Sequence, residues 1–366
     1  MKSRNVLLIG YDTNICLGVL FCLKDLNGSI HLLTNKKNNP AKHSKFLSGG
    51  YYEYNSEDKE EQIIDKIIEI IKDNRIDLIM PIGEGDGRLV SKHKEVLNQH
   101  AACTFLPEID KFDIGVNKRR LAEELLKNNI PCPSFTIVSN GDQLFVKAEE
   151  YGYPVLVKPS RGASGRMIKK IVSKSELEDF LKTIENDNEF ILQPYINGSD
   201  IDCSVLCKDG EIICYTIQQG ISDQGDSFKP RESIEFLDDS EVYNVASRMM
   251  KVLNWSGVAH IDLRIDKSDN QVKVIEINGR FWASVVASYL KAGVNFPMIL
   301  VKLSLGEEVD IPTQKVSKQL SLRDYFHLKI KSKEKVRLED TKFSFYKHDL
   351  TARAYQVLEK ITRKIS

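Results

Sequence analysis

The first 110 residues alternate between continuous apolar runs and helical patterns. The runs NVLLIG, SIHLLT and DLIMPIG are typical of buried strands. Between them, leucines recur at helical spacing from Leu17 to Leu23, and EEQIIDKIIEIIKD places its isoleucines on one helical face. This alternation predicts an N-terminal parallel α/β domain, residues 1–110, with helices on the faces of its sheet.

From residue 111 the pattern changes. NKRRLAEELLKNN predicts a charged amphipathic helix that stops before Pro131 and Pro133. YPVLVKP, MIKKIV and EFILQPYI predict strands, and SKSELEDFLKTI and DSEVYNVASRMMKVL predict helices. DCSVLCKDGEIICYTI predicts a hairpin with a Lys-Asp-Gly turn, and GVAHIDLRID with QVKVIEIN predicts another. Helices mixed with hairpins predict a largely antiparallel α+β unit, residues 111–312.

The tail, residues 313–366, is basic. Two interpretations stay open: a segment that touches anionic lipid or another chain, and a solvated extension or small closing subdomain, which composition favours. The basic residues that stand out are Lys329, Lys331, Lys333, Lys335, Arg337, Lys360, Arg363 and Lys364.

Composition narrows the classes of function. A chain of 366 residues with 42% hydrophobic and 28% charged residues fits a globular protein of two or three units. Its formal net charge of +0 gives no reason to expect a nucleic-acid partner. No apolar run approaches the ~20 residues of a membrane span, and no signal peptide is evident. The seven cysteines form no metal-ligand pattern, so we expect reduced thiols and a cytoplasmic protein.

The stretch VIEINGRFW, residues 274–282, carries the clearest candidate chemistry. Glu276, Asn278 and Arg280 alternate with apolar residues, so they share one face of a strand. The preceding hairpin strand ends HID, which we expect to bring Asp262 beside Glu276. Two carboxylates and an amide oxygen are ligands suited to Mg²⁺, and Arg280 could hold a phosphoryl group. The alternative is a solvated strand face with Asn-Gly as a turn.

A second candidate lies in KPSRGASGR, residues 158–166. Its small residues, Gly162, Ala163, Ser164 and Gly165, let backbone N–H groups approach an anion, and Lys158 and Arg161 add positive charge. The loop lacks the spacing of the G-x-x-x-x-G-K-[ST] phosphate loop and lies between two strands, so we interpret it as a phosphate-covering flap. A simple Gly/Ser turn is equally consistent with it.

In this order, the motifs resemble the ATP-grasp superfamily. NKRRLAEELLKNNIPCPSF, PVLVKPSRGASGR, ILQPYI, HIDLR and IEINGRFW are similar to carboxylate–amine ligases and to the synthetase halves of carbamoyl-phosphate synthase large chains. The resemblance implies an ATP-grasp module of two α+β subdomains, preceded by the α/β domain. It implies the following roles: phosphate contacts for Lys118 and Lys158, a flap from Arg161 to Arg166 that includes Gly162, Ala163, Ser164 and Gly165, an adenine pocket of Gln193, Tyr195 and Ile196, a ribose contact for Asp200, metal ligation by Asp262, Glu276 and Asn278, and phosphoryl stabilisation by Arg280. The sequence departs from the usual pattern at Gln193, Asp200 and Gly279.

The implied reaction is ATP-dependent. A carboxylate takes the γ-phosphate of ATP to form an acyl-phosphate, and an amine then displaces phosphate, with Mg²⁺, or Mn²⁺ as an alternative, assisting. The partners are small-molecule carboxylate and amine substrates, with amino acids among the candidates, and a homodimer stays open. Carboxy-phosphate formation, plain phosphoryl transfer and non-catalytic nucleotide binding on the same fold are the alternatives.

Residues around the predicted site have weaker signals. Glu84 and Asp86 follow a predicted parallel strand, where ligands bind, but they also fit a turn that caps the next helix. Lys229 and Arg231 lie in a polar loop that could reach a substrate carboxylate. Trp282 and Ser284 could wall the acceptor pocket, although a buried aromatic is the simpler interpretation of Trp282. We leave His260 out of the catalytic set, because a lone strand histidine is more often structural.

Overall fold

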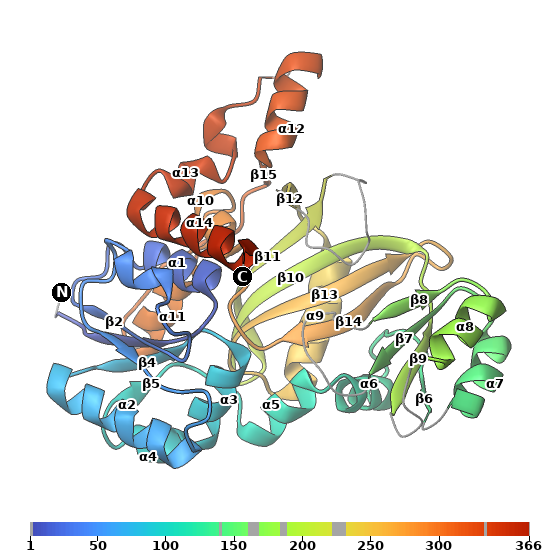
Figure 1. Cartoon of the computed structure of the whole chain (residues 1–366), viewed down its shortest axis with the longest axis horizontal. Helices are drawn as coiled ribbons and strands as arrows, with labels where there is room; N and C mark the ends of the chain where they lie inside the picture. Colours follow the sequence, from blue (N-terminus) through green and yellow to red (C-terminus); the bar gives the residue numbers. More distant parts are fainter. Residues whose placement is uncertain are drawn as a thin grey trace.

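The computed structural model describes residues 3–138, 141–159, 168–183, 189–221, 232–332 and 335–365. It contains a parallel sheet, two antiparallel sheets and a C-terminal set of helices that ends in the 16-residue α14 (Figure 1). The predicted combination of α/β and α+β units is therefore confirmed. No helix within these ranges is long and apolar enough to cross a membrane.

The N-terminal sheet is parallel and has helices on both faces. Alternate residues of β1 face opposite cores: Val6 and Leu8 pack with α1, whereas Leu7 and Ile9 pack with α2. The strand order is β3 (Tyr51–Glu53), β2 (Ile30–Thr34), β1 (Val6–Ile9), β4 (Leu78–Pro81) and β5 (Ala102–Cys103). The helices of this unit are α1 (Thr13–Cys22), η1 (Pro40–His43), α2 (Glu60–Asn74), α3 (Glu84–Lys92) and α4 (Lys94–Leu97).

The small antiparallel sheet carries the predicted phosphate-binding strand. Its order is β6 (Thr136–Val138), β9 (Phe190–Pro194), β7 (Val155–Pro159) and β8 (Lys169–Ile171). Helices α7 (Gly141–Tyr151) and α8 (Lys174–Leu181) pack on it through Leu144, Ala148 and Leu177. The Ser173 hydroxyl accepts from the Glu176 N–H and caps α8, the helix that SKSELEDFLKTI predicts. Strands β7 and β8 flank the predicted flap, which lies outside the described residues.

The large sheet has six strands and two unlike faces. Its order is β14 (Val272–Asn278), β13 (Gly257–Asp266), β10 (Gly198–Lys208), β11 (Glu211–Gly220), β12 (Ile234–Phe236) and β15 (Ser317–Gln319). Ile201, Cys203, Ile261 and Val274 pack on one face against α9 (Ser240–Leu253), α5 (Ile109–Val116) and α6 (Lys118–Lys127). The side chains that alternate with them face the other way and include most of the predicted site.

Both predicted hairpins are confirmed. Asp209 and Gly210 have positive φ angles of 50° and 81° at the Lys-Asp-Gly turn between β10 and β11, where Gly210 meets no steric penalty. The second hairpin pairs Asp262 directly with Glu276, and a bulge follows between Asp262 and Leu263.

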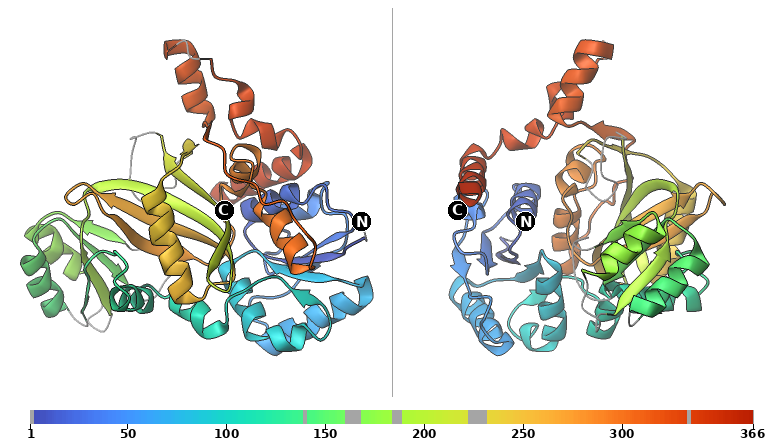
Figure 2. Two further views of the ribbon diagram at one scale, coloured as in Figure 1. Left: turned by 180° about the vertical axis from the view of Figure 1, so that it is seen from behind. Right: turned by 45° about the vertical axis from the view of Figure 1, so that its right-hand side comes forward.

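The C-terminal part returns to the N-terminal sheet. Helices α10 (Val285–Leu290) and α11 (Phe296–Ser304) share a core with α1. Beyond β15 the chain forms α12 (Leu322–His327), η2 (Leu328–Ser332), η3 (Leu338–Asp340), α13 (Phe343–Tyr346) and α14 (Leu350–Ile365). Figure 2 shows α12 and η2 projecting from the body and α14 lying beside the N-terminal domain. The domain limits at 110 and 312 stay predictions, because one core contains segments from both sides of these limits.

Candidate active site

Four elements bring two lysines and two carboxylates to one edge of the large sheet. Lys118 begins α6, Lys158 lies on β7, Asp262 on β13 and Glu276 on β14. The Lys118 Nζ lies 2.9 Å from Glu276 Oε2, with 19% and 23% of the two side chains exposed. Asn117 caps α6 by accepting from the Arg120 N–H, and this fixes where the helix, and with it Lys118, begins. The predicted phosphate and metal residues therefore meet.

Lys158 is almost fully buried. Burial lowers its pKa to about 8, attraction to Glu276 opposes this, and repulsion from Lys118 adds to it. Lys118, Lys158 and Gln193 line a pocket whose other walls are mainly apolar: Leu121, Ala122, Leu125, Cys132, Pro133, Ile191, Val274 and Ile275. The side-chain Oε1 of Gln193 is buried and has no hydrogen-bond partner among the described residues. This Gln193 oxygen and the buried Lys158 ammonium would suit a ligand that carries both hydrogen-bond donors and negative charge.

The carboxylates next to this pocket constrain one another. Burial raises the pKa of Asp262, and the nearby charges of Asp202 and Glu276 raise it further. Burial also acts to raise the pKa of Glu276, but Lys118 and Lys158 outweigh it and leave this pKa lowered. Asn278 Oδ1 accepts from the Arg280 guanidinium at 3.1 Å, and a second Arg280 nitrogen donates to the Phe281 carbonyl at 2.9 Å. Arg280 is thus held at the end of β14, beside the carboxylates.

Cross-strand register extends this edge into two polar rows across the sheet. The first row runs Gln218, Asp202, Asp262, Glu276 from β11 to β14, each residue paired with the next. The second row runs Thr216, Ser204, His260, Asn278 on the same four strands. Since these residues alternate with the buried apolar set, one face packs on α9 and the other presents eight polar side chains.

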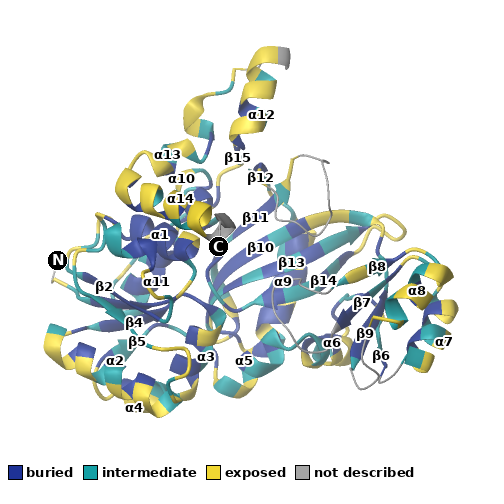
Figure 3. Cartoon of the chain, viewed as in Figure 1, coloured by how far each residue is buried: buried dark blue, intermediate teal, exposed yellow. Residues whose placement is uncertain are grey.

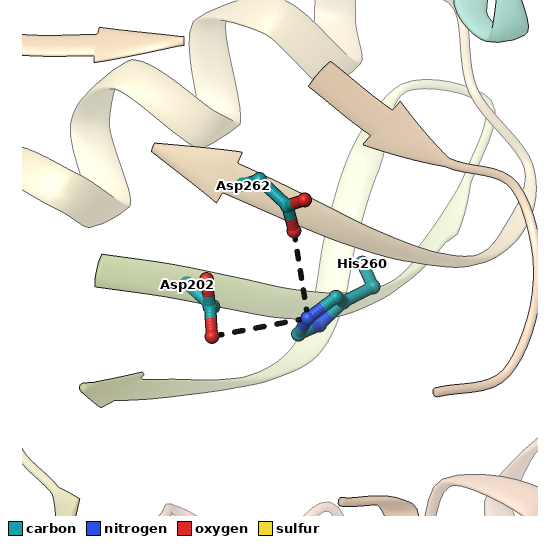
Figure 4. A group of neighbouring side chains, drawn as sticks. All are labelled: Asp202, His260 and Asp262. Atoms are coloured by element: carbon teal, nitrogen blue, oxygen red, sulfur yellow. Dashed lines mark ion pairs between the residues drawn. The ribbon is translucent and has the colours of Figure 1, made fainter. Parts of the chain in front are cut away.

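His260, which we leave out of the catalytic set on sequence alone as a lone strand histidine, lies at the centre of these rows. Ser204 Oγ lies 2.8 Å from its Nδ1. Its Nε2 is 3.6 Å from Asp262 and 3.9 Å from Asp202, as drawn in Figure 4. Burial, with repulsion from Arg280, lowers its pKa to about 3, so the ring is neutral at pH 7 and these two contacts are not ion pairs. Its ring stacks on Trp282, with centroids 5.6 Å apart.

At the far end of the rows, the neutral side chains of Gln218 and Ser284 adjoin Asp202. Gln218 donates to Asp202 Oδ2 at 3.2 Å and accepts from the Ser284 hydroxyl at 2.9 Å. Burial raises the pKa of Asp202 to about 6, despite the hydrogen bond from Gln218. Trp282 is buried, as the simpler interpretation predicts, and Ser284 instead orients Gln218. The alternating Asp-x-Asp-x-Ser of residues 200–204 was the sequence signal for this end.

The N-terminal domain also reaches the site. Burial raises the pKa of Glu84, while Arg280, Lys118 and the Gly279 N–H lower it, so Glu84 lies near the phosphate edge. Asp86 instead accepts from the Gly83 N–H at 3.2 Å and caps α3, as the turn interpretation predicts. Of the two acidic residues, Glu84 is the one that adjoins the predicted site.

The remaining predicted contacts stay predictions. Asp200 pairs with Arg264, whose Nε donates to the Ile196 carbonyl at 2.8 Å and whose NH2 donates to the Tyr195 hydroxyl at 3.1 Å. Neither Tyr195 nor Ile196 lines the pocket that contains Gln193. The flap residues Arg161, Gly162, Ala163, Ser164 and Gly165 lie outside the described residues, as do Lys229 and Arg231.

Comparison with known families agrees with this geometry. Residues 116–284 match the model of the ATP-grasp domain, a range that contains Lys118, Lys158 and both polar rows. Residues 116–284 form an ATP-grasp domain. The resemblance seen in the sequence motifs is thereby confirmed for this part of the chain.

Similar proteins extend the likeness beyond the ATP-grasp domain. The chain is 26% identical over 276 residues to the arginine-specific carbamoyl phosphate synthase large chain of Geobacillus stearothermophilus, covering 74% of this chain and 25% of that protein. It is 25% identical over 293 residues to the D-alanine–D-alanine ligase of Acetivibrio thermocellus, covering 71% of this chain and 74% of the ligase. The chain thus spans about a quarter of the synthase.

A solved structure supports the fold of the whole chain. The N5-carboxyaminoimidazole synthetase of Staphylococcus aureus, complexed with ADP, superposes with a TM-score of 0.69 at 15% identity, covering 89% of this chain and 87% of that one. The superposition therefore includes the N-terminal domain and the ATP-grasp domain together.

Proposed function

We propose that this protein is an ATP-dependent ligase that joins a carboxylate to an amine through an acyl-phosphate. The observation that carries the proposal is the convergence of Lys118, Lys158, Asp262 and Glu276 on one edge of the ATP-grasp domain. Similarity to a D-alanine–D-alanine ligase supports this reaction class. Which carboxylate and which amine react is set by residues beyond this edge.

The pocket of Lys118, Lys158 and Gln193 fits ATP. The ammonium groups of Lys118 and Lys158 share one carboxylate, Glu276, so their positive charge is not fully neutralised by it. The triphosphate of ATP would supply the additional negative charge. Bound phosphate would raise the pKa of Lys158 again by attraction, so the buried lysine is matched to an anionic ligand. The Gln193 carbonyl, which lacks a donor among the described residues, can accept from the adenine amino group.

The donor set at the same edge fits Mg²⁺. Asp262 and Glu276 lie opposite each other on paired strands. The pKa of Asp262 is raised by burial and by the nearby negative charges of Asp202 and Glu276. A divalent cation would relieve that repulsion, and Asn278 adds a neutral oxygen. When bound, the cation neutralises phosphate charge during transfer. Mn²⁺, with similar oxygen preference, is the alternative.

The chain's own groups then serve both steps. In the first, a substrate carboxylate oxygen bonds to the γ-phosphorus and ADP leaves, while Lys158 and Arg280 balance the charge on the phosphoryl oxygens. In the second, the amine nitrogen bonds to the acyl carbon and phosphate leaves, and the nitrogen loses its extra protons. The polar rows lead from Glu276 towards Gln218 and Ser284, and we assign the acceptor to this direction. The neutral His260 keeps the middle of the rows free of a cation that would compete with the metal.

Hydroxylamine tests the acyl-phosphate directly, because it traps this species as a hydroxamate without a specific acceptor site. The purified chain is incubated with ATP, Mg²⁺ and each member of a panel of amino acids and hydroxy acids. We expect hydroxamate and ADP with at least one carboxylate, and amide when an amine replaces hydroxylamine. ADP release that no carboxylate stimulates would refute the proposal.

Glu276→Gln is the matching variant. It keeps the size of the side chain but removes the charge that holds Lys118 and the metal, so we expect ADP formation to fall at least ~100-fold. The control is Glu123→Gln on the outer face of α6, where the side chain is 51% exposed and pairs with Arg119. Equal rates of ADP formation in the two variants would refute the assignment of Glu276 as a metal ligand.

Carboxy-phosphate formation is a second candidate, supported by the superposition on N5-carboxyaminoimidazole synthetase. Bicarbonate is therefore one arm of the panel. Stimulation of ADP release by bicarbonate, with none by any amino or hydroxy acid, would select this reaction over the ligase.

A further inference from the structure

The C-terminal segment, residues 313–366, differs in charge from the rest of the chain. It holds 14 Lys and Arg against 6 Asp and Glu, a net charge of +8, whereas the whole chain sums to zero. The first 312 residues therefore carry −8. More than half of the large apolar side chains that are exposed also lie in this segment. Surfaces that are both basic and apolar are unusual on a protein that makes no further contacts.

Helix α14 packs on the body through its polar side. Gln356 donates to the Asn14 side chain at 2.7 Å, and Lys36 reaches Glu359 at 3.0 Å. Just before the helix, Asp349 accepts from the Ser44 hydroxyl, and Ala352 fills the contact. The side of the helix that faces the N-terminal domain is thus held mainly by hydrogen bonds and an ion pair.

The opposite side of α14 carries an apolar stripe, defined by Leu350, Val357, Leu358 and Ile361. These residues recur at helical spacing, so they share one face. Leu350 is 65% exposed, Val357 and Leu358 are 55% exposed, and Ile361 is 49% exposed. An amphipathic helix normally buries this face. Here the described part of the chain leaves the α14 stripe uncovered.

The projecting arm, α12 with η2, repeats the arrangement. Leu322, Phe326 and Ile330 recur every four residues, and Ile330 is 74% exposed. Tyr325 is the residue that the arm buries instead. Exposed residues dominate the arm in Figure 3. Arg323 and Lys329 are also exposed on it, so this second stripe is basic as well.

We propose that the C-terminal segment holds the protein on an anionic lipid bilayer, with the α14 stripe inserted among the headgroups and the arm adding a second contact. Only a surface that is both apolar and negative matches the two stripes and their net charge of +8. This gives the ATP-grasp enzyme a place beside a membrane without a membrane-spanning helix.

A second copy of the chain matches these stripes less well. Two C-terminal segments brought together would repel each other, because both are strongly basic. The acidic body of another copy offers opposite charge but few apolar partners: its exposed large apolar side chains, Tyr11, Val96, Leu126, Val146, Val172, Ile221, Leu290 and Ile311, are spread over separate elements. Negative charge and apolar surface coincide on an anionic bilayer, whereas in the described part of the body the exposed apolar side chains are scattered.

Vesicle co-sedimentation of the full chain tests the proposal. We expect binding to vesicles with about 30% phosphatidylglycerol in phosphatidylcholine, at least roughly tenfold stronger than to phosphatidylcholine alone, and weakened by high salt. Equal binding to both vesicles, or none to either, would overturn it.

Val357→Asp and Val146→Asp form a matched pair, because both valines are on helices, are 55% exposed and change the charge equally. We expect Val357→Asp to reduce binding to the anionic vesicles at least roughly fivefold and Val146→Asp to leave it within about twofold. Equal losses in the two variants would overturn the proposal. So would a dimer, seen by sedimentation velocity without lipid, that Val357→Asp dissociates, since the α14 stripe would then bind a second copy.

Discussion

Lys158→Met separates the effect of the buried Lys158 on stability from the role in ATP binding that we propose for it. Burial is the larger cause of the pKa of about 8 at Lys158, against 10.5 for a free lysine, and only 5% of the residue is exposed. At 1.36 kcal/mol per pKa unit, this difference corresponds to about 3 kcal/mol by which folding disfavours the protonated form. Methionine has similar length and no charge, so it removes this cost.

The sign follows from proton binding. The folded-state pKa of Lys158 is depressed, so between pH 8 and about 10.4 the unfolded chain binds more protons than the folded one, and stability rises with pH in that window. Below pH 8 the full cost is present. We therefore expect Lys158→Met to raise the melting temperature at pH 7 by about 4 °C, and this advantage to shrink as pH rises from 8 to 10.

The same variant should bind ATP more weakly than the wild type. A hydrogen bond from a charged group is worth about 1.5–3 kcal/mol, so we expect affinity for ATP with Mg²⁺ to fall about 10- to 150-fold. Differential scanning calorimetry measures the first effect and isothermal titration the second. The control is Lys147→Met, because Lys147 is exposed on α7 and pairs with Glu150.

One pattern of results would refute the reasoning. If Lys158→Met melts below the wild type at pH 7, and the difference does not change up to pH 10, the lysine is not charged at a cost in the folded protein. Unchanged ATP affinity alongside a higher melting temperature would show instead that the pocket with Gln193 does not take the phosphates.

Three further substitutions test the surroundings of the site. Gly279→Ala should lower stability by about 1–3 kcal/mol, because its Cβ would lie 3.0 Å from two atoms of the buried Trp255 ring, and calorimetry measures it. Gly85→Ala is its opposite, since its Cβ would meet nothing within 4 Å on helix α3, and we expect a gain of about 0.5–1 kcal/mol; a loss there would show that the helix tolerates no change. Burial raises the Asp86 pKa to about 7, so between pH 4 and 7 the folded wild type keeps a proton that the unfolded chain releases, and its stability falls as pH rises. The free energy of unfolding of Asp86→Asn should therefore rise relative to the wild type over this range, by up to about 1.4 kcal/mol per pH unit. Denaturant unfolding at each pH measures this difference, and a constant difference would contradict the prediction.

Local sequence was sufficient for the longer strands, both hairpins and the pairing of Asp262 with Glu276, but it did not predict the short strands β3, β5, β6, β12 and β15. Asp262 and Glu276 could be paired in advance because a short loop joins their strands and alternation fixes which face each side chain takes. The charged helix that begins at Lys118 was likewise predicted from its local pattern, and the structure adds the Asn117 cap that fixes its start. These predictions depend on residues close together in the chain, where turn geometry and periodicity decide the outcome.

The other half of the site depends on strands that pair across long distances in the sequence. Nothing in the hairpins shows that β10 lies beside β13, which sets Asp202 opposite Asp262 and Ser204 opposite His260. His260 therefore looked like an isolated strand residue, although the sheet order places it between two carboxylates.

Helix α14 escaped prediction for a different reason. Its periodicity is plain in the sequence, and an apolar stripe normally predicts the buried face. The helix instead meets the body through Gln356 and Glu359. Periodicity identifies which residues share a face, but contacts elsewhere decide whether the partner is the protein's own core or another surface.

The polar rows decide what can lie against the site face of the large sheet at its Glu276 end, whereas Ser204 and Thr216 at the other end are fully buried. The carboxylates of Asp202, Asp262 and Glu276 cannot pack against apolar helices, because each buried charge would lose its hydration without a partner. On this face the neighbours are instead Lys118, Arg280 and Glu84, which supply charge and hydrogen bonds but leave Lys158 and Gln193 only partly matched. The resulting cost to stability is concentrated on the residues assigned to ATP and metal. That is why the substitution expected to stabilise the fold most, Lys158→Met, is also the one expected to remove nucleotide binding.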